Sequence, residues 1–123
     1  MKLIHKDADG RHVWQIEPGD KGVSNWGTHE NWYELTFAEK PVNGAHMPFN
    51  FQNGSPRDNG GVCNGWTLEG VLAMSMNRLT AVDKKMPCIE NKQALMHMQA
   101  AFDLLSARSQ GRRDRGVDGT MAP

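Results

Sequence analysis

The chain has 123 residues, of which 38% are hydrophobic, and its 14 basic side chains balance 14 acidic ones. This length suits one domain with a small core, and small cores are often completed by oligomerisation. The neutral charge argues against a protein that coats long nucleic acid nonspecifically, because that binding needs a basic excess. Positive charge is concentrated only in residues 108–123, where four arginines face two aspartates.

Residues 1–52 read as short strands and turns. Three segments combine alternating polarity with aromatic and β-branched residues, and glycine and proline residues separate them. These segments are RHVWQIE (11–17), NWYELTF (31–37) and MPFNFQN (47–53). We expect a small antiparallel sheet, with the first 46 residues serving mainly as a scaffold or lid.

Residues 53–66 form a glycine-rich stretch, NGSPRDNGGVCNGW, for which we expect a loop. The loop is either a plain connector or a phosphate-binding segment, because it leads into a helix for which Thr67 is the predicted N-cap. It lacks the Gly-Lys-Ser/Thr of a P-loop, so both interpretations stay open.

Residues 67–123 predict a helical hairpin with a basic C-terminal motif. The first helix carries an apolar stripe and should end near DKKMP, because Pro87 stops it. The second helix is predicted from about Cys88 to Gln110. The expected stripes are Leu68, Val71, Leu72, Ser75, Leu79 and Val82 on the first helix, and Leu95, Met98, Phe102 and Leu105 on the second.

Met96 and Leu104 lie off the stripe of the second helix. A helix that is apolar on more than one side usually buries both sides. Two helices cannot do this alone, so we expect the hairpin to mediate oligomerisation. The predicted fold class is α+β: a small antiparallel β region followed by this hairpin.

The basic motif has two interpretations that the residues alone support equally. Arg108 and Arg112 are four residues apart and share one face of the second helix, and Arg115 follows three residues later. Cations at a helix C-terminus complement its dipole by about 0.3–1 kcal/mol each. Arginine is also the side chain that binds phosphate groups bidentately, so the cluster could hold a pyrophosphate.

Other kinds of site receive no support from the sequence. Cys63 and Cys88 form no C-x-x-C, and the five histidines lack ligand spacing, so we expect no metal and no cofactor. No nucleophile and base stand together, so we expect no enzyme. No apolar run suits a signal peptide or a membrane span, so we expect a soluble intracellular protein.

Four segments resemble a known family. They are FQNGSPRDNGGVCNG, LEGVLAMSMNRL, PCIENKQAL and RSQGRRDRGVDGT, within residues 47–120, and the last is the most specific. The chain resembles the phage Thoeris anti-defence sponges of the first described type, whose helical hairpin is shared with the phage anti-CBASS cyclic-nucleotide sponges. Ile89 and Asp118 stand where the family has Arg and Glu.

The resemblance implies a protein that binds and sequesters a nucleotide immune messenger without cleaving it. The ligand would be a cyclic ADP-ribose isomer held between protomers, with cyclic trinucleotides or dinucleotides at separate sites. The protein would be a homo-oligomer, a dimer or a trimer of dimers, in the cytoplasm of the infected bacterial host. A messenger-degrading hydrolase and a small helix-turn-helix DNA-binding regulator are the alternatives.

The resemblance also implies which residues bind. Arg108 and Arg112 would hold the pyrophosphate, and Asn91 would provide polar recognition. Arg115, with the turn that begins at Gly116 and ends at Gly119, would serve a second phosphate site. The remaining candidates are Phe51, Asn53 and Asn64.

Overall fold

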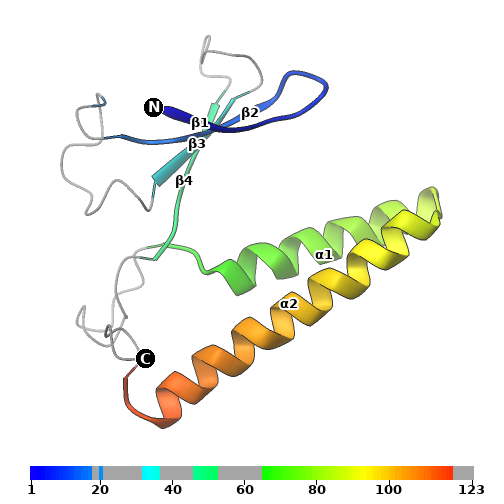
Figure 1. The fold of residues 1–123 in the computed structure, drawn as a ribbon. Helices are drawn as coiled ribbons and strands as arrows, with labels where there is room; N and C mark the ends of the chain where they lie inside the picture. The colour runs from blue at the N-terminus through cyan, green and yellow to red at the C-terminus, as the bar shows by residue number, and fades with distance from the viewer. Residues whose placement is uncertain (18–19, 21–31, 37–45, 53–64, 118–123) are drawn as a thin grey trace. The chain divides into compact units, whose positions relative to one another are not determined.

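A computed structural model describes residues 1–17, 20, 32–36, 46–52 and 65–117 (Figure 1). The chain divides into two compact units, Met1–Asn53 and Gly54–Pro123. The first unit is an antiparallel sheet and the second is a pair of helices, so the predicted α+β class is confirmed.

The sheet contains four strands in the order β1-β2-β3-β4, and each neighbouring pair is antiparallel. The strands are β1 (Lys2–Lys6), β2 (His12–Gln15), β3 (Trp32–Thr36) and β4 (His46–Asn50). The last three lie within the predicted segments, whereas β1 was not predicted. Its pairing with β2 shifts register between Leu3 and His5, so Ile4 interrupts the alternation that sequence analysis looks for.

Opposite faces of the sheet carry different side chains. On one face His12 and Thr36 are paired neighbours and both are buried, and Trp14 Nε1 donates a hydrogen bond to Thr36 Oγ1 at 3.1 Å. On the other face Phe51 meets Tyr33 and Phe49 edge-on, with ring centroids 5.6 and 5.2 Å apart. These contacts are why alternating aromatic residues form a sheet here.

The second unit consists of α1 (Leu68–Lys85) and α2 (Ile89–Asp114). Thr67 is the N-cap of α1, as predicted: its Oγ1 accepts a hydrogen bond from the Gly70 N–H at 3.0 Å.

Helix α2 continues four residues beyond the predicted end at Gln110. Gly111 stays helical, and Gln110 Nε2 donates to Asp114 Oδ1 at 2.8 Å across the added turn. The helix ends instead at Gly116, whose φ of 69° is left-handed. The Gly116 and Val117 N–H groups donate to the Arg113 and Arg112 carbonyls at 3.0 Å, which forms a Schellman motif.

The two predicted apolar stripes are half-buried along the contact between α1 and α2, apart from Leu68, which is exposed. Leu68 lies in the first turn of α1. No side chain in either helix is fully buried. Met96 and Leu104, which lie off the stripe, are exposed. The hairpin therefore has a seam but little core of its own.

Neither of these helices is long and apolar enough to cross a membrane, among the residues that the structure describes.

Candidate functional site

The start of α1 meets the end of α2 at the open end of the hairpin. Ser109 Oγ donates a hydrogen bond to Glu69 Oε1 at 2.9 Å, which joins residues 40 positions apart in sequence. This contact brings the N-terminus of α1, with its partial positive charge, to the part of α2 that carries the arginines (Figure 1). The structure thus unites two features that the sequence offered separately.

Arg108 is the most available of the arginines. Its side chain is exposed, and it makes no hydrogen bond or ion pair with any residue that the structure describes. Arg112 shares its face one turn further along α2 but is half-buried, and its Nη2 donates to the Val117 carbonyl at 3.0 Å. Arg112 therefore also holds the segment that follows the helix.

The next two arginines have other neighbours. Arg113 Nη2 donates to Gln110 Oε1 at 2.9 Å, and Arg115 Nε donates to the Gly111 carbonyl at 3.4 Å. The Gly116 N–H already donates within the Schellman motif. A second phosphate site at this point would therefore depend on the Arg115 side chain more than on the Gly116 amide.

Asn91 lies at the opposite end of α2. Its Nδ2 donates to the Met86 carbonyl at 3.2 Å, which places the side chain in the turn between the helices. Seventeen residues of helix separate Asn91 from Arg108, or about 25 Å at 1.5 Å per residue. The structure does not bring these two candidates together within one chain.

The turn itself is organised by Asp83. Its Oδ1 accepts a hydrogen bond from the Cys88 N–H at 3.3 Å, and its Oδ2 accepts one from Lys92 Nζ at 2.7 Å. The hydrogen bond from Lys92 is the main reason that the pKa of Asp83 is lowered. Asp83 therefore caps α2, because Cys88, the N-cap residue, makes no side-chain hydrogen bond of its own.

The remaining candidates belong to the other unit or lie outside the described residues. Phe51 is part of the aromatic cluster with Tyr33 and Phe49 in the sheet. Asn53 and Asn64 fall outside the described residues, as do most of the glycine-rich loop and the closing turn from residue 118 onward.

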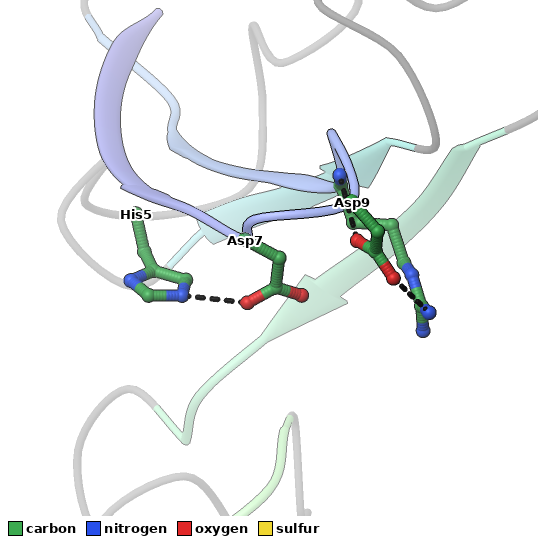
Figure 2. A network of polar contacts seen from close by, with 4 residues as sticks. His5, Asp7 and Asp9 are labelled. Carbon is green, nitrogen blue, oxygen red and sulfur yellow. Dashed lines mark hydrogen bonds and ion pairs between the residues drawn. The ribbon is translucent and has the colours of Figure 1, made fainter.

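A second polar network lies on the hairpin between β1 and β2 (Figure 2). His5 Nε2 lies 2.7 Å from Asp7 Oδ1, and Arg11 pairs with Asp9, which lowers the pKa of Asp9. All four side chains are exposed, so the network fastens the turn. Among the residues that the structure describes, no three His, Cys, Asp or Glu side chains are grouped to hold a metal ion.

Sequence reasoning missed three of these features. The contact between Glu69 and Ser109 could have been found from the hairpin register, because both residues lie on the facing stripes. The role of Asp83 as a cap carries no such signal, because it depends on the geometry of the turn. His12 is buried and stacks on Trp14, with ring centroids 5.7 Å apart, although its spacing resembles that of a surface residue.

Comparison of the chain with protein-family models and with curated protein sequences finds no match. The resemblance to the anti-defence sponges therefore stays a prediction that rests on the four quoted segments. The function has to be argued from the charges and contacts of the hairpin.

Proposed function

We propose that this chain is a phage anti-defence sponge that captures a nucleotide immune messenger, a cyclic ADP-ribose isomer, without cleaving it. The observation that carries the proposal is Arg108, an exposed guanidinium with no partner among the described residues, one turn from Arg112. Two arginines spaced in this way present two forks about 5–6 Å apart at their Cβ atoms, which suits the two phosphates of a pyrophosphate.

Electrostatics at the open end of the hairpin support an anionic ligand. The N-terminus of α1 contributes a partial positive charge near the arginines. Glu69 offsets part of it, but its carboxylate already accepts the hydrogen bond of Ser109. A doubly charged pyrophosphate would exchange weak solvent contacts of Arg108 for charge-assisted hydrogen bonds, each worth about 1.5–3 kcal/mol.

The separation of Asn91 from Arg108 supports a site shared between chains. A compact messenger cannot span about 25 Å, so it can touch both residues only if each comes from a different protomer. The proposed sponge is therefore a homo-oligomer, a dimer or a trimer of dimers. Cyclic trinucleotides or dinucleotides would bind separately, through Arg115.

Calorimetric titration with a cyclic ADP-ribose isomer tests this proposal. We expect Arg108→Ala and Arg112→Ala each to weaken capture about tenfold to hundredfold. Arg113→Ala is the matched control, because α2 continues to Asp114 and so places Arg113 about 100° around the helix from Arg112. Its affinity should be nearly unchanged.

Two controls separate the possible failures. A melting curve of Arg112→Ala shows whether the loss of its hydrogen bond to Val117 unfolds the end of α2. Recovery of intact ligand after heat denaturation distinguishes capture from hydrolysis. Equal affinity of all three variants would return the arginines to the role of complementing the helix dipole.

A further inference from the structure

Helix α2 has a second apolar stripe on the side away from α1. Met98 and Phe102 are half-buried in the seam with α1, and Ala100 lies about 200° around the helix from each of them. Around Ala100 the apolar side chains are exposed: Ile89 by 61%, Met96 by 62% and Leu104 by 73%. We call this stripe the outer face; its residues are Ile89, Gln93, Met96, Ala100, Leu104, Ala107 and Gly111.

We propose that the outer face binds a second copy of this chain, with the two α2 helices antiparallel and crossing at Ala100. The steps between its residues are four, three, four, four, three and four. This spacing is close to the 3.6-residue repeat, so the stripe runs almost straight along the helix for about six turns. Such a stripe suits a partner of the same length and shape.

The size of the side chains favours the antiparallel register. With Ala100 opposite the partner's Ala100, Met96 lies opposite the partner's Leu104, and Ile89 lies opposite the partner's Gly111. The large residues at one end of the stripe thus meet the small residues at the other end. Small residues at the crossing allow the helices to approach within the usual 8–10 Å.

The charges beside the outer face favour the same register. Glu90 and Arg108 are exactly five turns apart at 100° per residue, so both lie on the same flank of α2. Both are exposed, and neither makes a hydrogen bond or ion pair with a described residue. Antiparallel pairing places Glu90 beside the partner's Arg108 twice, whereas parallel pairing places like charges together, which costs free energy.

The size of the face indicates how strong the association should be. Stable interfaces usually involve about 20–30 residues on each side, and the outer face offers far fewer. The pairing should therefore depend on protein concentration. It rests on the outer face alone and stands whether or not a messenger binds, although it would also bring the Asn91 end of one α2 beside the Arg108 end of the other.

Sedimentation velocity of the full chain without nucleotide, over a series of protein concentrations, tests the proposed surface. The wild-type chain should shift from monomer to dimer, and Met96→Asp should stay monomeric over the same range. Met74→Asp is the matched control: Met74 is 63% exposed but lies on α1. A monomeric wild-type chain, or equal loss of dimer in both variants, would overturn the proposal.

Charge exchange tests the register. Glu90→Arg and Arg108→Glu should each weaken dimerisation about tenfold, because each places like charges together at two symmetric positions. The double variant should regain the wild-type dimer. In a parallel dimer Glu90→Arg would not weaken association, so failure of either single variant to weaken it, or of the pair to restore it, overturns the antiparallel register. Circular dichroism confirms that each variant is folded.

Discussion

Asp83 shows how one carboxylate can organise the turn between two helices. It accepts hydrogen bonds from the Cys88 N–H and from Lys92 Nζ, so it caps α2 and joins the two helices at once. Asn91 completes the turn through its hydrogen bond to the Met86 carbonyl. Residues at the turn therefore serve the hairpin first, and any binding role for Asn91 is added to that structural role.

We expect Asp83 to make the stability of the hairpin dependent on pH. Its pKa is lowered in the folded chain, so its contribution is present above the ordinary pKa of about 3.9 and is lost as the pH falls through the folded value. Asp83→Asn should therefore melt below the wild type at pH 7, and the two curves should converge near pH 3. Circular dichroism at 222 nm measures both.

Asp103→Asn is the control for this prediction. Asp103 is exposed on α2 and accepts a hydrogen bond from Gln99 within the same helix, at 2.9 Å. Its replacement should leave the difference between pH 7 and pH 3 close to that of the wild type. A constant gap between Asp83→Asn and wild type at every pH would mean that ionisation of Asp83 does not contribute.

At the scale of elements, the open end of the hairpin depends on the contact between Ser109 and Glu69. The two side chains are half-buried and 2.9 Å apart, and they join the first turn of α1 to the last part of α2. We expect Ser109→Ala to lower the free energy of unfolding by about 1 kcal/mol, because Glu69 loses its hydrogen-bond donor.

Ser106→Ala provides the reference for this measurement. Ser106 is also half-buried on α2, but it makes no hydrogen bond with the described residues. The change from serine to alanine improves helix propensity equally at both positions, so the difference between the variants isolates the hydrogen bond. Urea denaturation that finds the two variants equally stable would show that the contact contributes nothing.

The sequence predicted those elements whose periodicity is regular. Both helices, the Thr67 cap and three of the four strands were found in this way. β1 was missed because its register shift beside Ile4 breaks the alternation. The end of α2 was placed too early because Gly111 resembles a helix stop, whereas the left-handed residue that ends the helix is Gly116.

The candidate site was predictable in its charges and less so in its geometry. The spacing of Arg108 and Arg112 on one face followed from the helical repeat. That Arg112 also bonds to Val117 could not be predicted, because it depends on how the chain leaves the helix. The distance between Asn91 and Arg108 did follow from the predicted helix, and it is the strongest reason to expect a site shared between chains.

At the scale of the whole molecule, the two units differ in how they bury side chains. The sheet has fully buried residues, among them Ile16, His12 and Thr36. The hairpin has none within α1 or α2, and exposed apolar residues cover the outer face of α2. Burial on association would therefore stabilise the hairpin more than the sheet, since a partner that binds only the folded state shifts its folding equilibrium.

Amide hydrogen exchange measured at two protein concentrations should reveal this difference. Peptides from α2 between residues 89 and 111 should exchange more slowly at the higher concentration, because dimerisation suppresses opening of the helix. Peptides from β2 and β3 should exchange at the same rate at both concentrations. In Met96→Asp the dependence of α2 on concentration should disappear, while its exchange at the lower concentration should match that of the wild type. Protection of α2 that is independent of concentration in the wild type would instead show that the hairpin is stabilised within one chain.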